Sequence, residues 1–370
     1  MADDARRDNR AGRPLQCGGV RRSAQEFALA GGLSGLCAGC LPEGAPPWLV
    51  DHVIAAALHI GVAERGAFSP ESPRPDREVA SVLPGDTILA TPFIVGPDGP
   101  ADLTAVRPAW FYCSISACFG SVVRGEATRP CGVEPVPAAD TCSMGQAASG
   151  ALQLGSLTGF VDLSRRPPGL FMVAGTPGGP STAQCLKRLQ SDGGETLEAC
   201  LLVITRLPLG PAWRLIVLGA FAGVADAPPL SAIPPEAQDA EPDLFPAVQP
   251  FTLRIVGAEG ARVVTAEPGA TVRVRAGDAV EIVAPTDPRD AQYFVDAVAS
   301  GSATPSFVTG YERLSSSWLF TADVAPAQTE PGVTRWTVPE DQDTSFFGYF
   351  LLSDQRSLAS AWLRFEARAP

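Results

Sequence analysis

Lysine, histidine and methionine are scarce in this chain of 370 residues. Lys187 is the one lysine, so arginine supplies nearly all of the 28 basic residues. Acidic residues number 40, which gives a formal net charge of −12. Binding to nucleic acid needs clustered basic side chains that neutralise phosphates. A balance this acidic argues against that class of partner, and we predict no nucleic-acid binding.

The two histidines, His52 and His59, are seven residues apart. On a strand this spacing puts them on opposite faces, because successive side chains alternate. No HExxH pair, nucleophile elbow, P-loop or GxGxxG turn is present. We therefore predict no catalytic residue, no metal and no cofactor, and we assign both histidines structural positions.

Long apolar runs are absent after residue 40, so nothing there is long enough to be a membrane-spanning helix. Before it, Val20 to Cys40 reads VRRSAQEFALAGGLSGLCAGC. A short basic start, a brief apolar run and small residues at the end are typical of a secretory signal. Small residues directly before a cysteine also indicate a bacterial lipoprotein signal. This predicts that Cys40 is lipidated after cleavage.

Residues 1–19 are polar and arginine-rich, which suits no signal peptide, so we place the true start at Val20, read from a GTG codon. The signal departs from the usual pattern in two places, because Cys37 replaces an aliphatic residue and Glu26 interrupts the apolar run. Two alternatives therefore stay open. One is a plain secretory signal, and the other is a buried helix of an ordinary domain.

Cysteine usage gives an independent test of export. Nine cysteines are present. Three of them, Cys17, Cys37 and Cys40, precede the mature chain or carry its lipid. The six that remain are Cys113, Cys118, Cys131, Cys142, Cys185 and Cys200. An even remainder is typical of an oxidised, exported domain, so we predict disulfides among these six. Six cysteines allow 15 pairings, and spacing does not choose among them.

Glycine and proline, 37 and 36 in number, fall between short apolar runs, as turn residues do in all-β proteins. We predict four segments. Residues 1–40 are an over-long start and signal, 41–225 a disulfide-containing β-sandwich, 226–250 a proline-rich linker, and 251–370 an immunoglobulin-like β-sandwich. The fold class is all-β, with two tandem immunoglobulin-like sandwiches, the first of which carries a cysteine-rich insertion.

In the first sandwich, strands are predicted at Val53 to Val62, Glu78 to Leu83, Thr87 to Val95, Val106 to Ile115, Glu198 to Thr205 and Trp213 to Val224. Cys118 to Gly150 reads as a long loop, held by cross-links, and Ala183 to Gln190 as the one helix.

In the second sandwich, alternation of apolar and polar residues predicts strands at Phe251 to Val256, Arg262 to Ala266, Thr271 to Arg275, Ala279 to Ala284, Leu314 to Ala322, Val333 to Val338, Phe346 to Ser353 and Ala359 to Ala367. Trp110 and Trp318 occupy matching places in the two halves. We interpret both as core side chains and keep an exposed aromatic platform as the alternative.

The series LVDHVIAAALHIGVA, VLPGDTILATPFIVGPDGP and PAWFYCSI, with LSSSWLFTA, TRWTVPEDQD and GYFLLSDQRSLASAWLRFEA near the end, resembles surface lipoproteins of myxobacteria and related deltaproteobacteria. The resemblance covers most of the mature chain. It implies an envelope location and modules of the immunoglobulin-like or PKD-like kind. It implies no catalytic residues.

Two acidic groups offer oxygen ligands of the kind that calcium prefers. The first is Asp287, Asp290 and Asp296, and the second is Glu340, Asp341 and Asp343. No EF-hand loop is present, and acidic loop residues are ordinarily just solvated. We therefore predict no metal at either group.

We expect a non-enzymatic envelope lipoprotein, attached to the membrane through Cys40, that binds or scaffolds an envelope protein or a glycan. Leu41, in place of Asp, favours the outer membrane, on its periplasmic or its surface face. One alternative is a secreted carbohydrate- or peptide-binding module. The other is a secreted enzyme with its site in the cysteine-rich half. A row of exposed aromatics would favour the first alternative, and convergent acidic groups near Cys118 to Cys142 the second.

Overall fold

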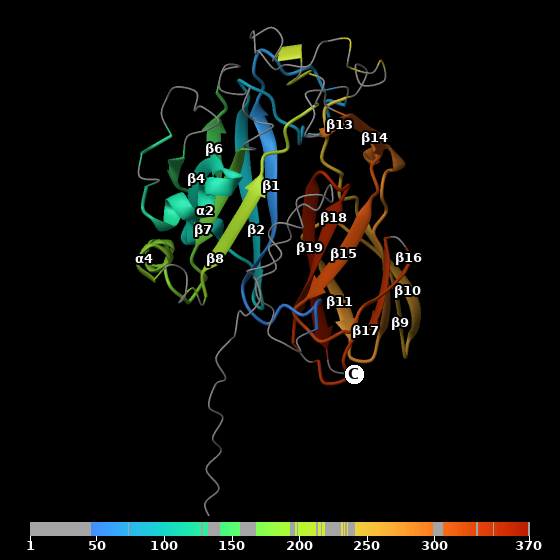
Figure 1. Ribbon diagram of the computed structural model, residues 1–370. Coiled ribbons are helices and arrows are strands. Elements are labelled where there is room, and N and C mark those ends of the chain that lie inside the picture. The colour runs from blue at the N-terminus through green and yellow to red at the C-terminus, as the bar shows by residue number, and fades with distance from the viewer. Residues whose placement is uncertain are drawn as a thin grey trace, which may run out of the picture.

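The computed structural model describes residues 46–72, 74–126, 129–131, 141–155, 168–192, 197, 199–211, 214–215, 217–218, 231, 233, 235, 241–298, 306–330, 332–342 and 344–368. The predicted signal and Cys40 lie outside these residues. The described chain is mostly β-sheet, and most of its strand pairs are antiparallel, as expected for an all-β protein (Figure 1). We call residues 46–211 the first half, 241–250 the junction segment and 251–368 the second half.

The first half contains two sheets. One consists of β1 (Ile54–Glu64), β2 (Thr87–Gly96), β3 (Gly99–Pro100) and β6 (Gly150–Gln153). The other has the order β5 (Cys142–Gln146), β4 (Ala109–Ser114), β7 (Pro168–Ala174) and β8 (Leu201–Arg206). Buried side chains from both sheets, among them Ile88, Trp110 and Leu170, form one core between them. The arrangement is sandwich-like.

Helices cover the outer face of the second of these sheets. α2 (Ile115–Val123) and α4 (Thr182–Asp192) pack on β4 and β7 over a separate buried cluster, while α1 (Leu103–Val106) is a single turn. α4 starts at a capping box, because the Ser181 backbone N–H donates to Gln184 Oε1 at 2.7 Å and the Gln184 N–H to Ser181 Oγ at 3.3 Å. The predicted helix over Ala183 to Gln190 is thus present.

The second half is a pair of facing sheets. The first has the order β10 (Gly260–Ala266), β9 (Phe251–Gly257), β12 (Ala279–Val283), β17 (Val333–Thr337) and β16 (Ala327–Glu330). The second has the order β11 (Thr271–Arg275), β19 (Leu358–Arg368), β18 (Phe346–Ser353) and β15 (Ser315–Phe320), with β11 parallel to β19. Between β12 and β15 the chain forms a short 3-10 turn, η4 (Pro288–Asp290), and a separate hairpin of β13 (Tyr293–Val298) and β14 (Ser306–Tyr311).

Alternation explains why this half folds as it does. The apolar residues of β9, Phe251, Leu253 and Ile255, are at most 1% exposed, while the residues between them face solvent. Seven aromatic side chains then fill the space between the sheets. They are Phe251, Trp318, Phe320, Trp336, Phe346, Phe350 and Phe365.

The β1–β2 sheet is buried on both faces. One face joins the core that contains Trp110, and the other packs Ala56, Ala57 and Val95 against Tyr349 and Leu351 of β18. A sheet covered on both faces needs a nearly continuous apolar sequence. The run IAAALHIGVA of β1 supplies it. In Figure 1 this sheet lies between the helices and outer sheet of the first half and the sandwich of the second.

The two halves also share backbone contacts. Val50 N–H donates to Phe320 O at 2.7 Å, and Phe320 N–H donates to Trp48 O at 2.7 Å, so residues 48–50 extend β15 at its edge. In the junction segment, Ala80 N–H donates to Asp243 O at 2.7 Å, and Leu244 N–H donates to Gln292 Oε1 at 2.7 Å. The described part of the predicted linker is therefore bonded to both halves.

Four local predictions are wrong. Glu78 to Leu83 forms only isolated bridges at Val79 and Val82, because its neighbours there are loops and not a strand. The described residues of Trp213 to Val224, numbers 214, 215, 217 and 218, are helical. Cys118 to Gly150, expected as a loop, contains most of α2 and all of β5. The helix α4 is not alone, and β6, β7, β16 and the β13–β14 hairpin were not predicted at all.

Candidate functional site

All six cysteines of the first half are paired. The disulfides join Cys113 to Cys118, Cys131 to Cys142, and Cys185 to Cys200. Each bridge links cysteines that are consecutive in the chain, with separations of 5, 11 and 15 residues. Because an oxidised cysteine has no thiolate to act as a nucleophile, none of the six is available for covalent catalysis in this state.

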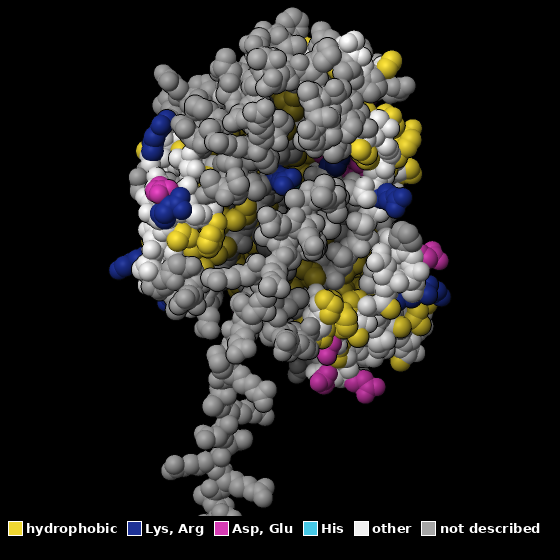
Figure 2. Space-filling model, in the orientation of Figure 1, with side chains coloured by type: hydrophobic (Ala, Val, Ile, Leu, Met, Phe, Trp, Pro, Cys, Tyr) yellow, Lys and Arg dark blue, Asp and Glu magenta, His cyan; other side chains and the backbone are white. Residues whose placement is uncertain are grey.

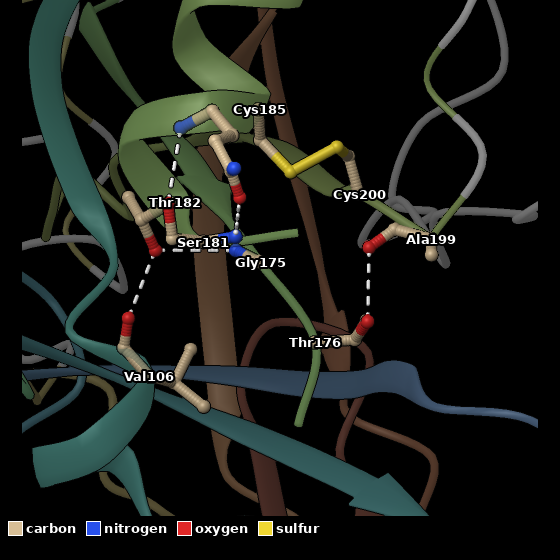
Figure 3. The surroundings of a disulfide bond; sticks show 9 residues. Val106, Gly175, Thr176, Ser181, Thr182, Cys185, Ala199 and Cys200 are labelled. Atoms are coloured by element: carbon tan, nitrogen blue, oxygen red, sulfur yellow. Dashed lines mark hydrogen bonds between the residues drawn. A yellow bond between two sulfur atoms is a disulfide. The ribbon is translucent and has the colours of Figure 1, made fainter. Parts of the chain in front are cut away.

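The longest of these bridges ties α4 to the chain that enters β8 (Figure 3). Around it, Gly175 N–H donates to Thr182 Oγ1 at 3.1 Å, and the Thr182 hydroxyl donates to Val106 O at 2.8 Å. The Thr176 hydroxyl donates to Ala199 O at 3.1 Å. The Thr182 side chain therefore ties the start of α4 to the end of α1 and to the chain that leaves β7, and the disulfide ties α4 to the chain that enters β8. This is a structural cluster.

The histidines have separate surroundings. His52 Nδ1 lies 2.5 Å from the carboxylate of its neighbour Asp51, and both side chains are about half exposed. His59 Nε2 lies 3.0 Å from Glu78 Oε2, and its ring stacks on Phe245 with 3.8 Å between centroids. His59 thus helps to hold the junction segment against β1, which agrees with the structural position predicted for it.

The acidic group predicted around Asp290 binds arginines. Asp290 is 3% exposed, and its Oδ1 accepts from Arg74 Nη2 at 2.9 Å and lies 3.2 Å from Arg77 Nη2. Asp287 binds Arg289, whose hydrogen bonds lower the pKa of Asp287 to about 2. The side chain of Asp296 and residue Asp343 lie outside the described parts, and Glu340 and Asp341 are at the surface. Guanidinium groups already neutralise Asp287 and Asp290, the two members of the first group whose side chains are described.

Trp110 and Trp318 lie in the two cores, with 0% and 5% exposure, so the interpretation of both as core side chains is confirmed. Trp110 Nε1 donates to Ala147 O at 3.0 Å, which satisfies the one polar atom of that ring. Of the large aromatic side chains in the described chain, Phe119 on α2 and Tyr311 on β14 are the exposed ones. They lie on different elements and form no row.

A buried carboxylate cluster that no sequence motif predicts lies at the junction of the halves. Asp243, Glu312 and Asp354 each offer one oxygen, and these atoms all lie within 4.8 Å of one another. The junction segment supplies the first, the chain after β14 the second and the turn between β18 and β19 the third. The three are separated by tens of residues in sequence, so no motif spacing links them.

Neighbouring donors bind two of these carboxylates. Ser357 donates to Asp354 through both N–H and hydroxyl at 2.6 Å, and Gln292 N–H donates to Glu312 Oε2 at 3.1 Å. Arg356 Nη1 lies 3.5 Å from Glu312 Oε1. Among the described residues this cluster has the donor set that could hold a cation, but the arginine and these donors already serve two of its carboxylates. Nothing else at the cluster indicates a metal.

Burial and like charge raise the pKa of two of these groups. Desolvation, with the neighbouring Asp243 and Asp354 carboxylates, raises the pKa of Glu312 to about 9. Desolvation also raises the pKa of Asp354, and the Ser357 hydrogen bonds oppose that rise. Glu312 therefore retains a proton at neutral pH, which reduces the repulsion within the cluster.

The outer face of the five-stranded sheet contains an open depression of about 660 Å³. Arg254, Glu281 and Arg335 lie side by side across three strands there, and Arg335 Nε lies 2.5 Å from Glu281 Oε2. Small and aliphatic side chains, including Val256 and Ala279, surround this row. The surface is open, which suits contact with a macromolecule better than enclosure of a small substrate.

Basic side chains form no continuous patch among the described residues on the face shown in Figure 2. None of the described helices has both the length and the apolar sequence needed to cross a bilayer. Comparison of the chain with protein-family models, with curated proteins and with solved structures gave no match.

Proposed function

We propose that this protein is an exported, non-enzymatic lipoprotein of the bacterial cell envelope that binds or scaffolds another envelope component. The observation that carries the proposal is the pairing of all six first-half cysteines. Disulfides persist in oxidising compartments and are rare in the cytosol of mesophiles. Three bridges in one half therefore support export, and Val20 to Cys40 supplies a signal for it.

Anchoring through Cys40 is part of this proposal. Cys40 lies outside the described residues, and the described chain begins six residues after it, at Pro46. A single acyl chain holds a protein weakly, so stable attachment requires the several chains of a mature lipoprotein. Leu41 favours the outer membrane, where an envelope protein or a glycan would be the ligand.

We further propose that the second half is immunoglobulin-like. In that fold strands A, B, E and D form one sheet and C, F and G the other. The orders β9-β12-β17-β16 and β15-β18-β19 match this scheme, with β10 added outside β9 and β11 beside β19. Trp318 lies on β15, the C position, where that fold has its core tryptophan. The first half has a different strand order, so the proposal is restricted to the second.

The close packing of the halves favours a presenting role over a catalytic one. Both histidines bind neighbouring carboxylates, the six cysteines are oxidised, and two buried acids of the junction, Glu312 and Asp354, bind donors of Gln292, Arg356 and Ser357. The β1–β2 sheet joins the two halves through an apolar interface. Because the two halves pack on this shared sheet, their outer surfaces keep a fixed orientation relative to each other, as a scaffold requires.

Intact mass of the protein purified from the membrane fraction tests the proposal. We expect a mature chain that begins at an acylated Cys40 and takes up alkylating reagent only after reduction, at six cysteines. The matched control is Cys40→Ser, which should lose the acyl mass and leave the three disulfides intact. An unprocessed chain whose cysteines alkylate without reduction would refute export and anchoring together.

A further inference from the structure

The strand β10 is a free edge of the five-stranded sheet. Within the described chain it pairs with β9 alone, through an unbroken register from Gly260–Gly257 to Ala266–Phe251. In Figure 1 it lies at the outer margin of the second half. An edge strand presents unpaired N–H and C=O groups that form a template for another strand.

The hydrogen-bond pattern of the sheet shows which groups are unpaired. Val338 N–H donates to Asp278 O and Ala284 N–H to Gly332 O, which fixes the alternation of bonded pairs between β12 and β17. Bonded and non-bonded pairs alternate along each antiparallel ladder, and each residue directs its N–H and C=O to the same side. The registers of β12 with β9 and of β9 with β10 therefore show which β10 residues bond to β9. Gly260, Arg262, Val264 and Ala266 therefore bond to β9. Ala261, Val263 and Thr265 direct their backbone groups away from the sheet.

The side chains of these three residues favour a second strand. Ala261, Val263 and Thr265 all lie on the outer face, are uncharged and are exposed. Val263 is 69% exposed and lies diagonally beside Val256, which is 41% exposed. Proteins usually protect an edge with proline, a bulge or charge, and β10 has neither proline nor bulge. The one charged side chain of β10, that of Arg262, donates to the backbone oxygen of Arg273 on β11, in the other sheet.

The other edge of the same sheet is protected. β16 has only four residues, all of them exposed, and its register against β17 shifts between Gln328 and Glu330. A short, bulged, acidic edge is a poor template, so β10 of one molecule has no matching β16 on the next. Open head-to-tail filaments are therefore disfavoured. A two-fold contact between identical edges needs no β16 partner and closes after two molecules.

The sequence of β10 is complementary to itself in that contact. With Val263 opposite its own copy, Ala261 faces Thr265 and Thr265 faces Ala261, and all three pairs have their backbone groups directed at one another. Arg262 falls opposite Val264, so no pair in the strand places like charges together. We propose that two copies of this chain join through β10 in antiparallel register, centred on Val263, and continue the five-stranded sheet across both molecules.

The dimer is tested with the full chain carrying Cys40→Ser, so that an acyl group cannot itself cause association. Sedimentation velocity over a wide concentration range should show a monomer–dimer equilibrium. Val263→Lys, which places a charge at the centre of the contact, should raise the dimer dissociation constant at least about tenfold. Val308→Lys is the matched control, because Val308 is an exposed valine (49%) on the separate β14 strand, and it should leave the equilibrium unchanged.

Cross-linking gives a second readout that does not depend on a weakened variant. Directly opposed residues in a bonded pair have Cα atoms about 5.5 Å apart, within the range of a disulfide. Val263→Cys should therefore yield a covalent dimer under mild oxidation. Thr252→Cys, on the same face but one strand inward, should not. A chain that stays monomeric at all concentrations would overturn the proposal. So would equal effects of Val263→Lys and Val308→Lys, or equal cross-linking at both cysteine positions.

Discussion

The two halves of the molecule stabilise similar β-sheet architectures in different ways. The core between the sheets of the first half contains two large aromatic side chains, Trp110 and Tyr112, and its helical layer is held by disulfides. The second half has no cysteine, and seven aromatic side chains fill its core. Covalent links are used where the chain departs from the sheets into helices and loops. Aromatic packing suffices where strands follow one another directly.

The largest expected effect is the loss of one aromatic ring from the second half. Phe350 is 1% exposed, and its ring centroid lies 5.0 Å from that of Trp318 and 5.2 Å from that of Phe251. Phe350→Ala should lower the free energy of unfolding by about 3–5 kcal/mol, because it leaves a cavity in a packed core. Denaturant unfolding of the variant and of the unchanged protein measures this loss of stability. Tyr311→Ala, at a site 73% exposed, should change stability by less than about 0.5 kcal/mol, and an equal cost at both sites would contradict the comparison.

The disulfides should contribute according to the loops that they close. The Cys185–Cys200 bridge spans 15 residues and the Cys113–Cys118 bridge 5. Replacing both Cys185 and Cys200 by alanine should lower the free energy of unfolding by about 3 kcal/mol. The same change at Cys113 and Cys118 should lower it by about 2 kcal/mol, since a bridge that closes a longer loop removes more entropy from the unfolded chain. Chemical denaturation of the two double variants provides the measurement. The reverse order of cost would show that native packing at the bridges outweighs loop entropy.

The junction should make stability depend on pH. The pKa of Glu312 is raised from 4.5 to about 9, so the folded protein holds a proton that the unfolded chain releases above pH 4.5. The free energy of unfolding should therefore fall as pH rises between those values, by at most about 1.4 kcal/mol for each pH unit. Glu312→Gln should remove most of that slope. Glu259→Gln, at an exposed residue whose pKa Arg275 lowers, should leave the slope above pH 5 unchanged.

The smallest effect concerns a single hydrogen bond between the halves. The buried Tyr349 hydroxyl on β18 donates to Gly96 O of β2 at 2.6 Å. Tyr349→Phe should cost about 1 kcal/mol, because it removes a buried hydrogen bond at an apolar interface. Calorimetry should still show one unfolding transition, since the apolar contacts around Tyr349 remain. Two separated transitions in the variant would mean that this bond, and not the apolar interface, couples the halves.

Much of the second half was predictable because its strands follow a period of two. β9, β11, β12, β17, β18 and β19 all lie within a few residues of their predicted limits. The β13–β14 hairpin was missed, since it packs away from the main sheets and needs no alternating apolar face. α2 was read as loop because ISACFGSVV is rich in β-branched and small residues, and tertiary packing on β4 and β7 decides its helix. The even number of cysteines indicated disulfides, but the folded chain alone selects their pairing.

The carboxylate cluster could not have been predicted. Asp243 lies in a segment that reads as a linker, Glu312 follows a hairpin that was not expected, and Asp354 lies in a turn. Each of these acids looks like an ordinary surface residue in its own sequence context. Only the packing of the two halves brings them within reach of one another and removes their water. A site built from three unrelated loops leaves no spacing pattern in the sequence.

The strand-like contact of residues 48–50 with β15 has a consequence for how the protein can be made and divided. The chain crosses to the second half before it enters β1, so its first described residues pair with β15, a strand that comes about 270 residues later in synthesis. Contacts of such long sequence separation form late, because the intervening loop must close first. A fragment of residues 251–368 would contain every core aromatic of its sandwich. It would nonetheless leave the β15 edge bare and Tyr349 without its cover, and such a fragment is expected to be prone to edge-to-edge aggregation.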